Sequence, residues 1–201
     1  MACRGDAVVT RDLGRLLVLT DRSQAVRPLL EVLSAAVDAG ARTVVVREKD
    51  LPTARRLALA EAAWPLLDAV GGTVILAGGP GTRIHLATVD PLPVPRPELL
   101  GRSCHDAAEL DRAEEEGIDY VTCSPVFASA SKPGYGPALG PAGLGALCRR
   151  TPLPVYALGG VTARTAGECR AAGAAGVAVM GEVMRATDPR RVVAELLAAV
   201  A

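Results

Sequence analysis

The chain has 201 residues, half of them hydrophobic, which is enough for one core and close to the lower limit of an eight-unit α/β barrel. Its 22 acidic residues balance its 22 Lys and Arg residues, so no net field attracts nucleic acid or an anionic membrane. No leader peptide or membrane-spanning apolar run is evident, and the five cysteines form no C-x-x-C pair. We expect a cytoplasmic protein with one domain, residues 1–201, and a small-molecule partner rather than a nucleic acid or a membrane.

Short apolar or β-branched runs alternate with Ala- and Leu-rich stretches of helical spacing, as in repeated βα units. Strands are predicted at residues 16–20, 43–47, 73–77, 83–86, 100–103, 120–123, 154–158 and 176–180. Helices are predicted at residues 25–39, 53–69, 106–116, 164–172 and 189–200. The pattern predicts a single (β/α)₈ TIM barrel.

Two connections depart from this regular pattern. Residues 78–82, between the third and fourth predicted strands, are too few for a helix, so one outer helix is expected to be missing or shortened. Residues 90–97 contain four prolines and are expected to form an extended connection.

The rarest polar residues lie at one end of the predicted barrel. The chain has only two Lys and two His. Lys49, His85, His105 and Lys132 all lie near or just past the carboxyl end of a predicted strand. In TIM barrels this rim carries the active site, so the four residues are candidates for it.

The two histidines differ in their surroundings. His85 lies within a strand between apolar neighbours, where a hydrogen-bonded structural role is as plausible as substrate binding. His105 directly precedes Asp106, a predicted helix N-cap, at the mouth of the barrel. His105 is therefore the predicted catalytic acid–base residue.

Glycines follow the last two predicted strands. Gly159 and Gly160 come after the seventh strand, and Gly181 comes directly after Met180, at the end of the eighth. Glycine allows an anion to approach the backbone, and N–H groups at a following helix start can bind it. These loops predict a site for a phosphate monoester, with a simple tight turn as the alternative.

Together these residues resemble the thiamine-phosphate synthase and thiazole tautomerase (TenI) superfamily. The resemblance covers nearly the whole chain and rests on several ordered motifs: Leu19-Thr20-Asp21, Val46-Arg47-Glu48-Lys49, His85-Leu86 with Asp90, Gly101-Arg-Ser-Cys-His105, Asp119-Tyr120-Val121, Pro125-Val-Phe127 with Lys132, Ala157-Leu-Gly-Gly-Val161 and Gly173-Ala-Ala-Gly-Val-Ala-Val-Met180. It implies that the glycine loops and Met180 bind a thiazole phosphate, and that the protein forms a homo-oligomer.

The synthase branch joins hydroxymethylpyrimidine diphosphate to thiazole phosphate and uses Mg²⁺ held by two aspartates. The resemblance assigns the diphosphate to Arg47, Lys49 and Lys132, hydroxyl contacts to Ser103 and Ser129, and one metal position to Asp90. The other aspartate is absent, because the chain reads Leu76-Ala77-Gly78-Gly79 there, and Val45 replaces a family Gln.

The tautomerase branch shifts a proton in a carboxylated thiazole phosphate and needs no metal or other cofactor. His105 resembles the proton-transfer residue of that branch, although synthases often carry His there too. Because of the missing Asp and Gln, the leading hypothesis is a TenI-like thiazole tautomerase. A Mg²⁺-dependent thiamine-phosphate synthase is the first alternative, and a non-catalytic binder of thiazole or thiamine phosphate is the second.

Overall fold

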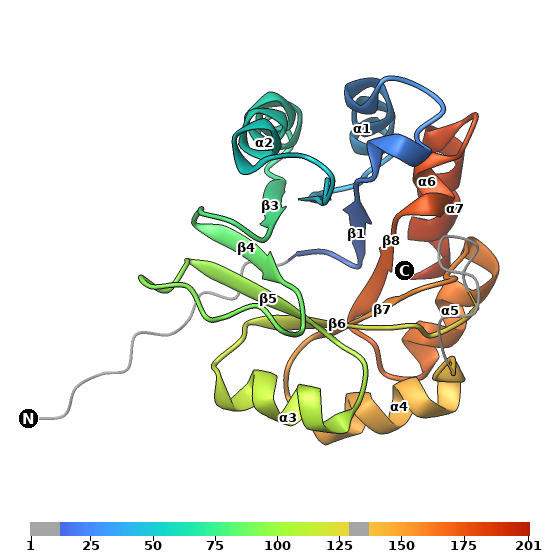
Figure 1. Cartoon of the computed structure of the whole chain (residues 1–201). Helices are drawn as coiled ribbons and strands as arrows, with labels where there is room; N and C mark the ends of the chain where they lie inside the picture. The colour runs from blue at the N-terminus through green and yellow to red at the C-terminus, as the bar shows by residue number, and fades with distance from the viewer. Residues whose placement is uncertain (1–12, 129–136) are drawn as a thin grey trace, which may run out of the picture.

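A computed structural model describes residues 13–128 and 137–201. Eight parallel strands pair in chain order, and β8 pairs with β1, so that the sheet closes into a barrel (Figure 1). The strands are β1 (Leu16–Leu19), β2 (Thr43–Val46), β3 (Thr73–Ala77), β4 (Arg83–Leu86), β5 (Leu99–Cys104), β6 (Tyr120–Cys123), β7 (Val155–Leu158) and β8 (Gly176–Val179). The predicted TIM barrel is confirmed, and each strand end lies within one residue of its predicted place.

Helices pack around the outside of this barrel. They are α1 (Leu29–Asp38), α2 (Thr53–Asp68), α3 (Ala107–Glu115), α4 (Gly140–Arg150), α5 (Ala163–Ala171), α6 (Gly181–Met184) and α7 (Pro189–Ala199), with a 3-10 turn η1 (Arg22–Gln24). The first predicted helix was placed too early, because Pro28 keeps the residue before it out of helical geometry. The prediction missed α4, whose three glycines lower its helix propensity, and the short α6.

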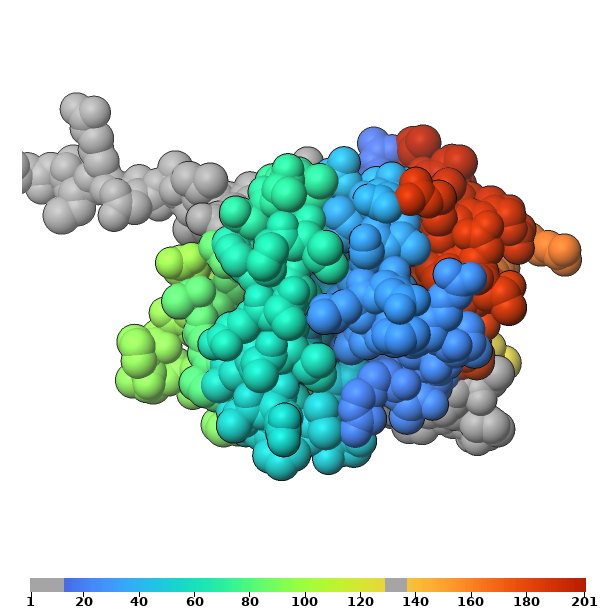
Figure 2. Space-filling model, turned by 90° about the horizontal axis from the view of Figure 1, so that it is seen from above, coloured from blue at the N-terminus to red at the C-terminus, as the bar shows by residue number. Residues whose placement is uncertain are grey.

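One side of the barrel has no outer helix. Residues 78–82 and 87–98, which flank β4, contain only turns and irregular structure, as predicted. In Figure 1 no helix lies over β4, whereas Figure 2 shows α2, α1 and α7 side by side over a neighbouring face. Buried Arg102 on β5 holds residues 87–98 in place by donating to the carbonyl oxygens of Ala87, Thr88 and Asp90 at 3.1, 2.9 and 3.0 Å.

The expected homo-oligomer and cytoplasmic location stay predictions.

The strands separate two hydrophobic layers. Inside the barrel lie side chains such as Leu17, Ile75, Tyr120 and Tyr156, while a larger set packs between the strands and the helices. This alternation follows from the two-residue period of a strand. Burial raises the pKa of the Cys104 thiol, in the outer layer, to about 12, which keeps it protonated and unreactive. In the two described ranges, no helix is long and apolar enough to cross a bilayer.

Candidate active site

A cavity of about 330 Å³ opens at the carboxyl ends of β7 and β8. Its walls come from the loops after these strands, from the ends of β1 and β2, and from the first residues after β6. Gly159, Gly160, Met180, Gly181 and Arg47 all line it. The structure therefore brings five of the predicted site residues together in one cavity.

Close packing explains why the loop after β7 requires glycine. Gly159 and Gly160 have φ angles of 93° and 65°, which side-chain-bearing residues rarely adopt. A Cβ atom on Gly159 would lie 2.9 Å from Cα of Pro125, and one on Gly160 would lie 2.8 Å from Cβ of Phe127. The loop is thereby fixed against the segment after β6, and Thr162, the N-cap of α5, also lines the cavity. A helix start beside a glycine turn suits an anion.

A guanidinium group lies over the second glycine loop. A Cβ atom on Gly181 would lie 2.6 Å from Cζ of Arg185, so glycine lets the guanidinium lie directly against the backbone at the cavity. Arg185 donates to the side chain of Gln24, and Gln24 donates in turn to Asp21 Oδ2 at 2.6 Å. The cavity thus carries an arginine that the prediction missed.

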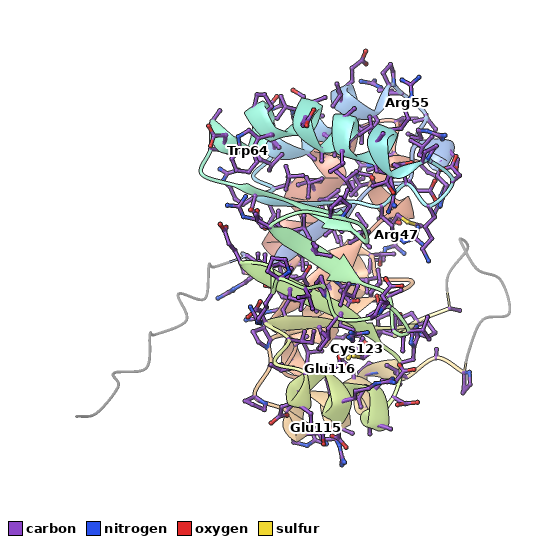
Figure 3. All side chains as sticks on the ribbon, turned by 60° about the vertical axis from the view of Figure 1, so that its left-hand side comes forward. Arg47, Arg55, Trp64, Glu115, Glu116 and Cys123 are labelled. Carbon is purple, nitrogen blue, oxygen red and sulfur yellow. The ribbon has the colours of Figure 1, made fainter. Side chains whose placement is uncertain are left out.

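A second guanidinium enters the cavity from β2. Arg47 Nη1 lies 3.6 Å from the Met180 sulfur, and its backbone N–H donates to Thr20 Oγ1 at 2.9 Å. Figure 3 shows Arg47 at the end of the molecule toward which the strand arrows point. Two arginines, a glycine turn and a helix start make this cavity suited to a phosphate group.

His105 is held by a carboxylate on the rim after β5. Its Nδ1 lies 3.0 Å from Glu109 Oε2 and 3.1 Å from Thr88 Oγ1. The Thr88 hydroxyl donates to the Ser103 carbonyl oxygen at 2.9 Å, so it accepts from the imidazole. Nδ1 therefore acts as a hydrogen-bond donor, which orients the ring on the rim in a way that suits proton transfer.

His85 is buried inside the barrel, with 6% of its surface exposed. Nδ1 contacts the Tyr120 hydroxyl at 3.1 Å, and Nε2 contacts Ser103 Oγ at 2.9 Å. Burial lowers the pKa of His85 to about 4, and the positive charges of Arg47 and Arg102 contribute. His85 is thus neutral and hydrogen-bonded to Ser103; substrate binding by either residue stays a prediction.

The remaining predicted residues are more dispersed. Lys49 is exposed just past β2 and lies outside the cavity lining. His105 also lies outside that lining, although it is on the same rim. Ser129 and Lys132 lie outside the described residues. The structure therefore brings the predicted phosphate-binding glycines into one cavity, while phosphate binding there and diphosphate binding by Arg47, Lys49 and Lys132 stay predictions.

Comparisons with known proteins agree with these features. The family model described as thiamine monophosphate synthase matches residues 91–183. A putative thiamine-phosphate synthase of Geobacter sulfurreducens is 37% identical over 91% of this chain and 92% of its own length. The chain belongs to the thiamine-phosphate synthase/TenI superfamily. A thiamine-phosphate synthase of Anaeromyxobacter dehalogenans is 39% identical over 82% of this chain and 80% of its own.

A solved structure gives the same result for the fold. The thiamine phosphate pyrophosphorylase of Pyrococcus furiosus superimposes with a TM-score of 0.83 at 25% identity. The match covers 96% of this chain and 97% of that one. The predicted resemblance to the thiamine-phosphate synthase/TenI superfamily is confirmed over nearly the whole chain.

The residues near Asp90 do not fit the magnesium ion that the synthase branch of the superfamily implies. Asp90 Oδ2 accepts the backbone N–H of Ala87 at 2.8 Å, and no carboxylate is present at Gly78. A Cβ atom on Gly78 would instead lie 3.6 Å from Nη1 of Arg56. Within residues 13–128 and 137–201, no group of three or more His, Cys, Asp or Glu side chains could hold a metal ion. Mg²⁺ prefers several oxygen ligands, which this end of the rim does not offer.

Three arginines near the rim escaped the sequence-based prediction: Arg56, Arg102 and Arg185. Arginine is common in this chain, so it gave no compositional signal. Arg102 had a usable signal, since a lone charge inside the apolar strand β5 must find buried partners. Arg56 lies half-buried on α2 and Arg185 lies exposed just after α6, and only the fold brings them to the site.

Proposed function

We propose that the chain is a thiamine-phosphate synthase, joining hydroxymethylpyrimidine diphosphate to a thiazole phosphate. The observation that carries the proposal is the glycine-lined cavity at β7 and β8, in a chain 37% identical to a putative synthase over 91% of its length. The names of the similar proteins favour this activity over the tautomerase, which was the leading hypothesis from sequence.

The cavity accounts for one substrate. The phosphate of the thiazole binds the turn at Gly159 and Gly160 and the start of α5, with Arg47 and Arg185 balancing its charge. The apolar walls, which include Leu19 and Leu158, exclude water from the adjacent ring.

The reaction itself needs charge neutralisation more than proton transfer. The C–O bond between the pyrimidine methylene and the diphosphate breaks, and its electron pair leaves with the diphosphate. The thiazole nitrogen lone pair then forms the new C–N bond, giving thiamine phosphate and free diphosphate. Cationic side chains near the β2 and β3 ends of the rim stabilise the leaving group.

The second candidate is the thiazole tautomerase, and a specific contact favours it. The Glu109 carboxylate accepts a hydrogen bond from Nδ1 of His105 and so orients the ring for proton exchange with a substrate. The tautomerase reaction needs no metal, and among the residues that the structure describes no group of carboxylates is placed to hold one.

A paired assay decides between the candidates. Purified protein is incubated with both synthase substrates, with and without Mg²⁺, and separately with the carboxylated thiazole phosphate in deuterated solvent. Thiamine phosphate formation above background supports the proposal. Isomerisation and deuterium uptake without coupling would replace it with the tautomerase. Binding of thiazole phosphate without either turnover would contradict both and leave a non-catalytic binding protein.

The variant His105→Ala sharpens this assay. A tautomerase using His105 as its acid–base residue loses about 10² to 10⁴ in rate while keeping its affinity for the thiazole phosphate. For the synthase we expect a loss of less than about tenfold, because coupling needs no proton transfer at this residue. A synthase rate reduced as strongly as a tautomerase rate would give His105 a role in coupling.

A further inference from the structure

The first residues of α2 place a guanidinium beside the turn that follows β3. Arg56 donates from Nη1 to the carbonyl oxygen of Ala77 at 2.6 Å and from Nη2 to Thr53 Oγ1 at 3.0 Å. A Cβ atom on Gly78 would lie 3.6 Å from Arg56 Nη1 and 3.9 Å from Asp90 Oδ2. Arg56 and Asp90 therefore approach the same point from two sides.

Arg56 keeps hydrogen-bonding capacity at this position. A guanidinium has five N–H groups, and the hydrogen bonds to Ala77 and Thr53 use two of them. Its Nε is buried and has no acceptor among the described residues. Nη1 and Nη2 together keep two further N–H bonds, and the oxygens of an anionic ligand are acceptors that suit such donors.

The strand register places the residue that holds Arg56 level with Arg47, which lines the cavity. Val46 pairs with Leu76, so Arg47 and Ala77 follow at matching positions on neighbouring strands. Ala77 is the residue whose carbonyl oxygen holds Arg56. Arg47 and the carbonyl group that holds Arg56 therefore lie at adjacent strand ends of one rim.

We propose that Arg56 binds the diphosphate of the pyrimidine substrate, and that this chain neutralises that group with arginine instead of a protein-held divalent cation. The inference rests on the proposed synthase function. A cation placed near Asp90 would meet the positive guanidinium beside Gly78 and only one carboxylate. The same guanidinium attracts an anion and forms the paired hydrogen bonds that phosphate oxygens accept.

Inorganic pyrophosphate is the probe for this inference. Its binding to the full chain is measured by calorimetry in EDTA, so that no divalent cation takes part. We expect wild-type protein to bind pyrophosphate, Arg56→Gln to weaken binding about tenfold or more, and Arg56→Lys to keep part of the affinity. Arg55→Gln is the matched control, because Arg55 is the exposed neighbour on the same helix (Figure 3) and should leave affinity unchanged.

Manganese binding gives a readout that does not depend on activity. Electron paramagnetic resonance should detect no tight Mn²⁺ binding to wild-type protein in the absence of substrate. Tight Mn²⁺ binding to wild-type protein, or equal pyrophosphate affinity in Arg56→Gln and Arg55→Gln, would overturn the inference.

Gly78→Asp keeps the test valid if Arg56→Gln does not fold. An aspartate at this position would meet the Arg56 guanidinium, so we expect loss of pyrophosphate affinity that Mn²⁺ does not restore. If Mn²⁺ restores or raises the affinity, the guanidinium does not exclude a metal and the inference is wrong.

Failure of the inference can be told from failure of the proposed function. A protein that binds pyrophosphate through Arg56 but forms no thiamine phosphate contradicts the synthase proposal alone. A protein that forms thiamine phosphate with an unchanged rate in Arg56→Gln contradicts the inference alone.

Discussion

Two Gly-Gly turns follow strands on the same rim of the barrel and differ in what surrounds them. At the β7 turn, Cβ atoms on Gly159 and Gly160 would lie under 3.0 Å from residues 125–128 after β6. At the β3 turn, Cβ atoms on Gly78 and Gly79 would meet only side chains, at 3.5 to 3.9 Å. The same dipeptide thus forms a tightly packed wall in one place and an open turn in the other.

The difference shows what each half of the rim offers to an anion. The β7 half is shaped by backbone packed against backbone, and it offers a fixed cavity with a helix start. The β3 half is flanked by the charged side chains of Arg56 and Asp90. Substitutions in the first half should change binding through shape, and substitutions in the second should change it through charge.

The largest expected effect comes from Gly160→Ala. Its positive φ angle and the clash with Phe127 force the β7 turn away from the cavity wall. We expect the affinity for inorganic phosphate or thiazole phosphate to fall about 100-fold, measured by calorimetry.

Gly167→Ala is the control for this substitution. Gly167 lies inside α5, where a Cβ atom would be 3.5 Å from the Ala199 carbonyl oxygen, an ordinary contact. Alanine there should raise stability by up to about 1 kcal/mol and leave phosphate affinity unchanged. Equal affinity in both variants would show that the β7 turn does not form the phosphate site.

A pH effect is expected at His85, on β4 between the two halves. Its pKa is about 4 in the folded protein and about 6.5 in the unfolded chain, so only the unfolded chain gains the proton between these values. The stability that neutral His85 contributes is full above about pH 6.5 and is lost as the pH falls toward 4. The loss is up to about 1.4 kcal/mol per pH unit.

Denaturant unfolding across this range measures the effect. In His85→Gln the part of the stability loss between pH 6.5 and 4 that comes from His85 should disappear, whatever the effect of the substitution on stability at neutral pH. If wild type and variant lose stability in parallel from pH 6.5 to 4, the ring is not held neutral by burial.

Most of the fold could be predicted from the sequence because the strands are buried on both faces. Their β-branched and apolar runs alternate with segments of helical periodicity. This pattern alone locates each of the eight strands, with no information on tertiary contacts. Helix α4 could not be placed in this way, since it begins Gly140-Pro141 and contains further glycines at 143 and 145. Its stability comes from packing Leu144 and Leu147 into the outer core.

The site could be predicted only where local chemistry decides it. Glycines directly after strands are a sequence pattern typical of phosphate-binding loops. The pattern therefore predicted Gly159, Gly160 and Gly181, which line the cavity. Arg185 reaches the cavity across Gly181, and Arg56 reaches the β3 turn from α2. Such contacts join residues whose proximity depends on side-chain direction in the folded barrel, which sequence spacing does not determine.

A smaller effect than that of Gly160→Ala is expected from Arg47→Gln, which acts on charge at the border of the two halves. Arg47 lines the cavity and contacts Met180, while its backbone is held independently by Thr20. Removing one charged hydrogen-bond donor should weaken phosphate binding about tenfold, with little change in melting temperature. Arg47→Lys should recover part of the affinity; no recovery would indicate that the guanidinium geometry, and not the charge, is what binds.

The smallest effect should come from Gly78→Ala, the counterpart of Gly160→Ala in the open turn. Its φ angle of 67° makes alanine cost about 1 to 2 kcal/mol of stability, but the neighbouring atoms at 3.6 and 3.9 Å leave room for the methyl group. Chemical denaturation should detect that loss while calorimetry finds unchanged affinity for thiazole phosphate at the β7 cavity. If Gly78→Ala weakened that affinity as strongly as Gly160→Ala does, the two halves of the rim would act as one unit, and the contrast between shape and charge would fail.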